Sequence, residues 1–240
     1  MPVTLGQNVA EIVAGNFRAA EVFHRHRIDF CCGGSRTLEQ ACRERNLEPL
    51  ELLWELNEAC GRADASTEEL LQRDAEGLIA YISGHHHAYV RRALPSLLAQ
   101  AHKVAASHGR GHPELHEVVE LVEALAEEMT SHMFKEEHIL FPYIAAAAGA
   151  ARRGEAPPPA PFGSVDNPIR MMEHEHDAAG AMVARIRELT SDYGVPDGAC
   201  ATYVTCLREL EEFERDLHMH VHLENNVLFP RARALEAEHS

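Results

Sequence analysis

The chain contains two copies of an eleven-residue segment that is rich in metal-binding side chains. The copies span residues 132–142 and 220–230, and both end in Leu-Phe-Pro. In each copy a His is followed four residues later by a Glu, which gives the pairs His132 with Glu136 and His220 with Glu224. Residues four apart share one face of a helix, so each copy points an imidazole and a carboxylate in one direction. Such mixed nitrogen and oxygen ligands bind transition metals inside helical bundles.

The repeat extends towards the N-terminus. His87 lies 45 residues before His132, and His176 lies 44 residues before His220. We therefore predict two helical hairpins of the kind that gene duplication produces, each carrying a His and then a His-x-x-x-Glu. A pseudo-two-fold bundle would bring these six side chains to one centre, which is enough for two metal ions when the carboxylates bridge. A single His-x-x-x-Glu is usually a solvated helix face, but two copies at matched distances favour a metal site.

Composition limits the classes of function. The chain has 240 residues with 45% hydrophobic and 25% charged residues, which is typical of a soluble globular protein. Its formal net charge of −16 argues against nucleic acid or an anionic membrane as partner. The 17 histidines are a first indication of metal. We recognise no signal peptide and no apolar stretch long enough to span a bilayer, and six scattered cysteines favour reduced thiols in the cytoplasm.

These side chains need helices to position them, and the sequence shows no strand pattern. The apolar spacing predicts one helix over residues 5–27, a capping box at Thr37 and Gln40, and a helix that begins at Pro49. These elements form a predicted small domain that ends in a linker at residues 61–67. We place the domains at residues 1–65 and 66–240.

The second domain is predicted to be an all-α, up-down-up-down four-helix bundle. The four helices are expected at residues 67–101, 113–147, 166–192 and 197–228. A Pro-rich loop at residues 154–163 joins the two halves.

Helical phase places the candidate ligands on core faces. His132 shares its stripe with Leu125 and Ile139. A carboxylate on such a face is costly unless it is paired or bound to metal, so Glu136 and Glu224 require a partner. Satisfied core histidines beside surface glutamates are the alternative, but this would need the same coincidence in both halves.

Three adjacent histidines, His85, His86 and His87, leave the first ligand open. The apolar phase of the helix centres on His86, whereas the matched spacing of the repeat favours His87. We choose His87 as the ligand and keep His86 as its rival.

Further carboxylates lie near the candidate ligands. Glu128 precedes His132 by four residues and Asp216 precedes His220 by four, so each could accept a hydrogen bond from an imidazole, although a solvated acid is the ordinary alternative. Glu175 adjoins His176 and could belong to a polar path from solvent to the metals. The remaining histidines, such as His218 and His222, fall on outer faces and are predicted to be surface residues.

Cys31 and Cys32 are followed by two glycines. Adjacent cysteines do not readily form a strain-free disulfide, and Arg36 is close enough in sequence to lower a thiol pKa. A redox dithiol, a transient soft-metal ligand and an anchor for an iron–sulfur or iron–nitrosyl species are the functional alternatives, against two small buried hydrophobes. The sequence context favours a function here, and we interpret the other four cysteines as packing residues.

The chain resembles the Repair of Iron Centers family in four motifs: Asp29-Phe-Cys-Cys-Gly-Gly34, Ser131-His-Met-Phe-Lys-Glu-Glu137, Glu175-His-Asp177 and Leu223-Glu-Asn-Asn-Val-Leu-Phe-Pro230. The resemblance covers nearly the whole chain. It implies a hemerythrin-like bundle behind a short dicysteine domain. It also implies two non-haem iron ions with oxo and carboxylate bridges, held by His87, His132, Glu136, His176, His220 and Glu224.

The resemblance further implies a role in nitrosative and oxidative stress. The expected function is cytoplasmic repair of damaged iron–sulfur proteins, through iron donation or through reduction of nitric oxide to nitrous oxide at the di-iron centre. Residues matching Glu128 and Glu175 are associated in the family with a channel to the site, and Cys31 and Cys32 would pass electrons, iron or nitrosyl groups. Nitric oxide and oxygen are the expected small ligands, the electron donor is not indicated, and a homodimer is suggested by resemblance alone.

Two other classes of function compete with repair. One is a hemerythrin-like module that binds oxygen or nitric oxide, or senses iron, although such carriers tend to use more His and fewer carboxylates. The other is a helical bundle without functional iron.

Overall fold

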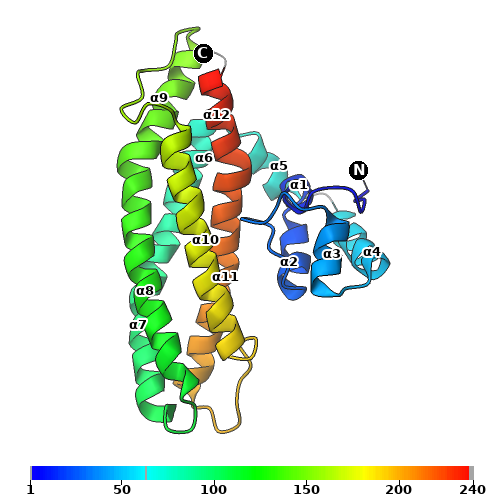
Figure 1. The fold of residues 1–240 in the computed structure, drawn as a ribbon, viewed down its shortest axis with the longest axis vertical. Helices are drawn as coiled ribbons and strands as arrows, with labels where there is room; N and C mark the ends of the chain where they lie inside the picture. Colours follow the sequence, from blue (N-terminus) through cyan, green and yellow to red (C-terminus); the bar gives the residue numbers. More distant parts are fainter. Residues whose placement is uncertain (1, 63, 238–240) are drawn as a thin grey trace. The chain divides into compact units, whose positions relative to one another are not determined.

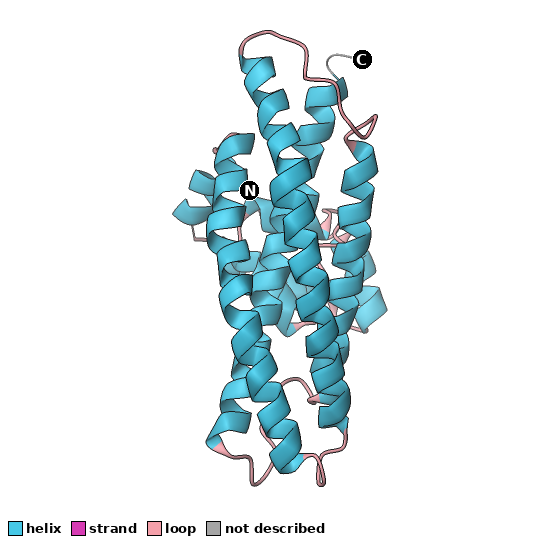
Figure 2. Cartoon of the chain, turned by 90° about the vertical axis from the view of Figure 1, so that its left-hand side faces the viewer, coloured by secondary structure: helices cyan, strands magenta, loops and turns pink. Residues whose placement is uncertain are grey.

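The computed structural model describes residues 2–62 and 64–237, and within these ranges the chain is helical (Figure 2). Apart from an isolated bridge between Asn8 and Thr37, the described residues contain no β-structure. The chain divides into two compact units. One comprises Met1–Ala80, Ile144–Val165 and His218–Ser240, and the other comprises Tyr81–Tyr143 and Asp166–Leu217. The all-α prediction is confirmed.

The second unit is a four-helix bundle (Figure 1). Its helices are α7 (Ala88–His108), α8 (Glu114–Lys135), α10 (Asp166–Leu189) and the part of α11 (Ala201–Leu223) up to Leu217. Helix α8 packs against α7 and α10. Helix α11 is tied to α7 by a 2.6 Å hydrogen bond from Gln100 to Glu209, and to α10 by a buried ion pair of Arg187 with Glu214. The predicted bundle is therefore present.

The first bundle helix begins later and ends later than predicted. A short helix α5 (Ala65–Leu71) starts inside the predicted linker and stops before α6 (Ala75–Tyr81). From Ala75 the chain stays helical to His108, whereas the sequence predicted residues 67–101. The last helix also continues past its predicted end at residue 228, through α12 (Phe229–Ala237).

Three π-helical turns interrupt these helices: η1 (Ile82–His87), η2 (Glu136–Leu140) and η3 (Glu224–Leu228). The backbone N–H of Phe141 bonds to the carbonyl of Glu136, and that of Phe229 bonds to the carbonyl of Glu224, in each case five residues back. A proline follows each of these two turns. Proline lacks an N–H and its ring clashes with the carbonyl four residues back, so the repeated Leu-Phe-Pro favours the wider turn.

The π-turn also changes which residues face the core. Ile139 was predicted on the buried stripe of His132, but 48% of it is exposed, while Leu140 is buried. The prediction was wrong because an extra residue in the turn rotates every later position. A wider turn can be recognised from structure but not from a uniform helical period.

The N-terminal part of the first unit is built from short helices: α1 (Val9–Gly15), α2 (Arg18–Arg25), α3 (Leu38–Arg45) and α4 (Pro49–Cys60). The predicted single helix over residues 5–27 is broken at Asn16, whose backbone is extended and whose side chain donates to the carbonyls of Cys60 and Arg62. The capping box of Thr37 with Gln40 and the helix start at Pro49 are confirmed. No described helix is both long and apolar enough to cross a membrane.

The same unit contains α9 (Phe141–Arg152) from Ile144 onwards, the last residues of α11, η3 and α12. His222 is fully buried against the rings of Phe17 and Phe30, and His218 lies against Phe30 and His24. Predicting His222 as a surface residue was wrong, because residues of the N-terminal part of this unit cover it, whereas His218 is half-buried.

Candidate metal centre

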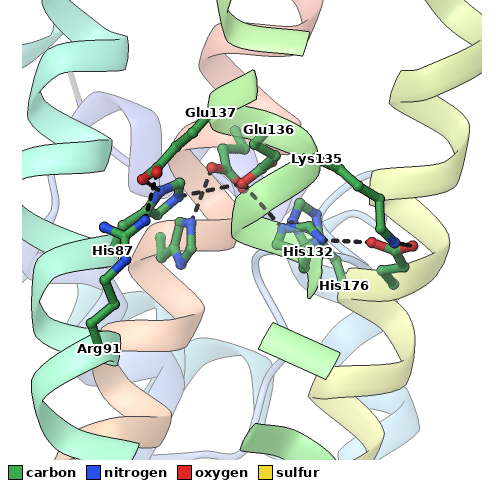
Figure 3. Close-up of polar contacts among 10 residues, drawn as sticks. His87, Arg91, His132, Lys135, Glu136, Glu137 and His176 are labelled. Atoms are coloured by element: carbon green, nitrogen blue, oxygen red, sulfur yellow. Dashed lines mark hydrogen bonds and ion pairs between the residues drawn. The ribbon is translucent and has the colours of Figure 1, made fainter. Parts of the chain in front are cut away.

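Four of the predicted ligands lie together inside the four-helix unit. The Glu136 carboxylate stands between two imidazole rings, with its Oε2 at 3.3 Å from the Nε2 atoms of both His87 and His132 (Figure 3). His176 Nε2 lies 3.0 Å from His132 Nε2. All four side chains are buried, with Glu136 and His87 at 0% exposure. Four helical segments contribute here: η1, α8, η2 and α10.

The outer nitrogen of each of two histidines is held by a second carboxylate. His87 Nδ1 donates to Glu137 Oε1 at 2.7 Å, and His132 Nδ1 donates to Glu175 Oε2 at 2.9 Å. Arg91 pairs with Glu137 at 2.5 Å (Figure 3), and Lys135 pairs with Glu175. Carboxylates that hold the far nitrogen of a ligand imidazole fix its orientation and raise its basicity, and they are typical of metal sites.

Both outer carboxylates are ionised at neutral pH. Burial raises the pKa of Glu175, but the hydrogen bond from His132 and the contact with Lys135 outweigh it and bring the pKa to about 2. The pKa of Glu137 is also lowered, because hydrogen bonds from Arg91 and His87 outweigh burial. An ionised carboxylate only accepts hydrogen bonds, so the Nδ1 atoms of His87 and His132 carry hydrogen.

With hydrogen on Nδ1, the Nε2 lone pairs of His87 and His132 face the Glu136 carboxylate. In a neutral imidazole with hydrogen on Nδ1, Nε2 is an acceptor, and in both rings it faces Glu136 Oε2 at 3.3 Å. Acceptors that face each other in a buried site repel unless a cation or an extra proton lies between them. All three groups could bind one transition metal ion, since neutral imidazole nitrogen and carboxylate oxygen are its ordinary ligands.

The remaining predicted ligands, His220 and Glu224, form a pair in the other compact unit. His220 Nε2 lies 3.0 Å from Glu224 Oε1, and both residues are fully buried. The pair repeats the register of the first copy, because Glu224 opens η3 as Glu136 opens η2. Neither glutamate faces solvent, which the metal prediction requires.

The structure separates the rival first ligands. His87 points Nε2 at Glu136, whereas His86 donates from Nδ1 to Asp216 Oδ1 at 2.9 Å. Asp216 was predicted as an acceptor for a ligand imidazole, but its partner is His86, which directly precedes the predicted ligand His87. Glu175, not Glu128, accepts from His132, and Glu128 is half-buried.

Sequence reasoning missed Glu137, Lys135 and Arg91. Glu137 directly follows Glu136, and the pair of adjacent acids in Lys-Glu-Glu-His was a signal that could have found it. Arg91 lies one turn after His87, on the same face, and so could also have been found. Lys135 on α8 contacts Glu175 on α10, and no local sequence pattern indicates a contact between two helices.

The dicysteine loop is organised around Asp29. Its Oδ1 accepts from the backbone N–H groups of Cys31 and Cys32, and its Oδ2 accepts from that of Gly33. The Cys31 thiol donates to Asp29 Oδ1 at 3.2 Å, and the two sulfur atoms are 3.9 Å apart, so both thiols are free. Asn226 of η3 donates to the Cys31 carbonyl at 2.9 Å.

The expectation that Arg36 lowers the pKa of a thiol here is wrong for Cys31. A hydrogen bond with Cys32, burial and the Asp29 charge raise the pKa of Cys31 well above its usual range. Arg36 instead binds the Gly33 and Asp29 carbonyls and the Glu44 carboxylate. Among the cysteines predicted as packing residues, Cys200 is exposed, and a hydrogen bond with His108 lowers its pKa to about 7.

Comparison with known proteins agrees with this geometry. Residues 78–232 match the hemerythrin HHE cation binding domain, a range that includes all six predicted ligands. Residues 5–73 match ScdA_N, a domain of unknown function (DUF542). The iron-sulfur cluster repair protein YtfE of Yersinia pestis strain Pestoides F is 38% identical over 215 residues, covering 90% of this chain and 91% of that protein. The chain belongs to the Repair of Iron Centers family.

A second relative has the same printed name. The iron-sulfur cluster repair protein YtfE of Yersinia pseudotuberculosis, serotype O:1b, is likewise 38% identical over 215 residues, with 90% and 91% of the two chains covered. The match spans both domains of this Repair of Iron Centers protein. The buried imidazoles and carboxylates lie in its cation-binding hemerythrin domain, which implies that iron is the metal bound.

Proposed function

We propose that the protein holds two non-haem iron ions in one centre. The six proposed ligands are His87, His132, Glu136, His176, His220 and Glu224. The observation that carries the proposal is the Glu136 carboxylate, fully buried between two imidazole nitrogens whose outer atoms are held by other carboxylates. The duplicated segment supports the inclusion of His220 and Glu224, because they repeat the same residues at the same place before a π-turn and a proline.

The centre is proposed to serve the repair of iron–sulfur clusters damaged by nitrosative or oxidative stress in the cytoplasm. The two relatives named above are iron-sulfur cluster repair proteins, and each covers nine-tenths of this chain. Imidazole and carboxylate ligands hold iron without the thiolates that would make a closed site, so the ion stays exchangeable. When bound, iron would supply both the ferrous ions for damaged clusters and the positions at which nitric oxide is reduced.

Residues around the centre would orient its ligands and balance the charge of the outer carboxylates. Glu137 and Glu175 keep the hydrogen of His87 and His132 on Nδ1, which leaves Nε2 as a ligand. Lys135 and Arg91 neutralise these acids at the surface side of the site. Glu175 is 11% exposed, and together with the half-buried Glu128 it is proposed to lie on the polar path to solvent.

Cys31 and Cys32 are proposed to contact the damaged iron–sulfur protein. Cys32 is partly exposed while Cys31 is buried, so Cys32 would meet the partner first. Together with Cys31 it is proposed to pass electrons, iron or nitrosyl groups between the centre and that partner.

The test is a cluster-repair assay. Apo-protein is reconstituted anaerobically with ferrous iron and then mixed with a [4Fe–4S] dehydratase that nitric oxide has inactivated. We expect recovery of dehydratase activity with the iron-loaded protein and none with Glu136→Ala, while His102→Ala on the exposed surface should behave as the parent chain. Recovery that is equal for the parent and Glu136→Ala would refute repair by this centre, and nitrous oxide measured in the headspace reports the nitric oxide branch separately.

A further inference from the structure

A second group of potential metal ligands lies in the four-helix unit. His85 and His86 in η1 and Asp216 in α11 offer one ligand atom each, and these atoms all lie within 4.8 Å of one another. His86 Nδ1 is 2.9 Å from Asp216 Oδ1. Two imidazoles and one carboxylate are the donor set of many zinc and ferrous iron sites that keep open positions for water or substrate.

This cluster differs from an ordinary His–Asp pair. The second carboxylate oxygen of Asp216, Oδ2, is buried and has no hydrogen-bond partner among the described residues. Leaving such an atom unsatisfied is destabilising, and more so when it is charged. His86 is itself 4% exposed. By contrast, His102 and Glu123 form a pair at 3.0 Å in which both side chains are about half exposed. Water can therefore hydrogen-bond to the atoms of these side chains that do not contact each other.

Aromatic contacts hold the two imidazoles in place. The Tyr81 ring is stacked on His85 with centroids 5.1 Å apart, and it meets His86 edge-on at 5.6 Å. The His85 and His86 rings are perpendicular, with centroids 4.8 Å apart. Such fixed rings lose little freedom on binding an ion, which favours metal affinity.

Burial increases along the three consecutive histidines. His85 is exposed, His86 is buried at 4% exposure, and His87 is fully buried with its Nε2 towards Glu136. All three belong to the same π-turn, η1. A metal ion bound by the first two would therefore share its helical turn with a ligand of the centre, and one of its own ligands would be exposed.

We propose that His85, His86 and Asp216 bind one divalent transition-metal ion outside the dinuclear centre, and that ferrous iron passes through this site on its way into or out of the centre. The binding of an ion here stands independently of the proposed function, whereas the exchange role rests on it. No change of oxidation state is involved, because the ion moves from one set of nitrogen and oxygen ligands to another.

Cobalt(II) is a suitable probe because its visible spectrum reports nitrogen and oxygen ligation. The full-length, iron-loaded protein is titrated anaerobically with Co²⁺, and bound cobalt and retained iron are both measured after equilibrium dialysis. We expect one Co²⁺ per chain in addition to the iron, with binding weakened at least ~10-fold in His85→Ala and in Asp216→Asn. His102→Ala, which removes a surface His paired with a carboxylate, should bind cobalt as the parent does.

His85 is exposed, so His85→Ala tests the site even where Asp216→Asn disturbs folding. Absence of the additional Co²⁺, or equal binding by the parent and His85→Ala, would overturn the site. If the proposed iron centre failed to form, cobalt would occupy its ligands too, but His85→Ala should still bind one ion fewer than the parent. The two failures are therefore distinguishable.

The exchange role is measured as the rate at which a ferrous chelator removes iron from the loaded protein. We expect the rate of iron release to fall at least ~5-fold in His85→Ala at unchanged starting iron content. The reason is that this variant lacks the outer binding site through which the iron is proposed to pass. Equal release rates in the parent, His85→Ala and His102→Ala would overturn the exchange role.

Discussion

The two copies of the repeated segment have the same backbone but different surroundings. Both place a Glu at the start of a π-turn that ends before Phe-Pro. In the first copy the next residue is Glu137, which binds His87 and Arg91. In the second copy the corresponding stretch is Asn225-Asn226, and Asn226 binds the Cys31 carbonyl of the dicysteine loop.

The outer faces of the two copies differ in the same way. Phe134 is 58% exposed, whereas the equivalent residue of the second copy, His222, is fully buried under Phe17 and Phe30. The repeated residues thus fix the helix geometry and the inward-facing ligands, while the residues between them determine what each copy contacts. The first copy is held by charges near the surface, and the second by the N-terminal helices.

The largest expected effect concerns the charges around the first copy. Glu137→Gln or Glu175→Gln removes an anion that orients His87 or His132, and we expect iron affinity to fall by about 10- to 100-fold. Competition with a ferrous chelator measures it. Glu117→Gln breaks an exposed ion pair with Arg185 and is the control, expected to be neutral. An iron affinity unchanged in both glutamine variants would show that these carboxylates are not part of the site.

The loop that the second copy anchors should react slowly with alkylating agents. The pKa of Cys31 is raised, so its thiol remains protonated as the pH rises through the usual range, and the thiolate forms only at higher pH. Cys200, with a pKa of about 7 and an exposed side chain, is an internal reference. At about pH 8 we expect iodoacetamide to label Cys200 at least ~10 times faster than Cys31, as followed by peptide mass spectrometry. Faster labelling of Cys31 would contradict the described loop.

The prolines should affect both copies alike. Pro142→Ala and Pro230→Ala each restore an N–H that can bond four residues back, which favours an ordinary α-turn in place of the π-turn. We expect the apo-protein to be stabilised by about 1–3 kcal/mol in urea unfolding, with weaker iron binding. Stabilisation without any loss of iron affinity would mean that the π-turns do not position Glu136 and Glu224.

The smallest effect should come from the contact that distinguishes the second copy. Asn226→Ala removes the hydrogen bond to the Cys31 carbonyl, and we expect the free energy of unfolding to fall by about 1 kcal/mol. His138→Ala changes the equivalent position of the first copy, where the side chain is exposed, and should cost less. The midpoints of urea unfolding are compared for the two apo-variants. Equal midpoints would contradict a stabilising contact that is specific to the second copy.

Much of this arrangement could be predicted from residue spacing. The all-α bundle followed from helical periods, and His132 and Glu136 lie together because residues four apart share a helix face. His87 and His176 join them in one buried cluster, as the matched spacing of the repeat predicted. Ile139 was misplaced because a wider turn breaks that period, and His222 because a helical period cannot indicate which face another part of the chain covers. Glu175 was named for a polar path to solvent, but its hydrogen bond with His132 was not predicted, since the two residues lie on different helices.

The most direct test asks whether both copies serve one centre. Iron content and Mössbauer spectra are compared for the reconstituted parent, His132→Ala and His220→Ala, one variant from each copy. We predict two magnetically coupled iron ions per chain in the parent, and loss of that coupling in both variants. A His220→Ala protein that keeps two coupled iron ions would contradict the shared dinuclear centre.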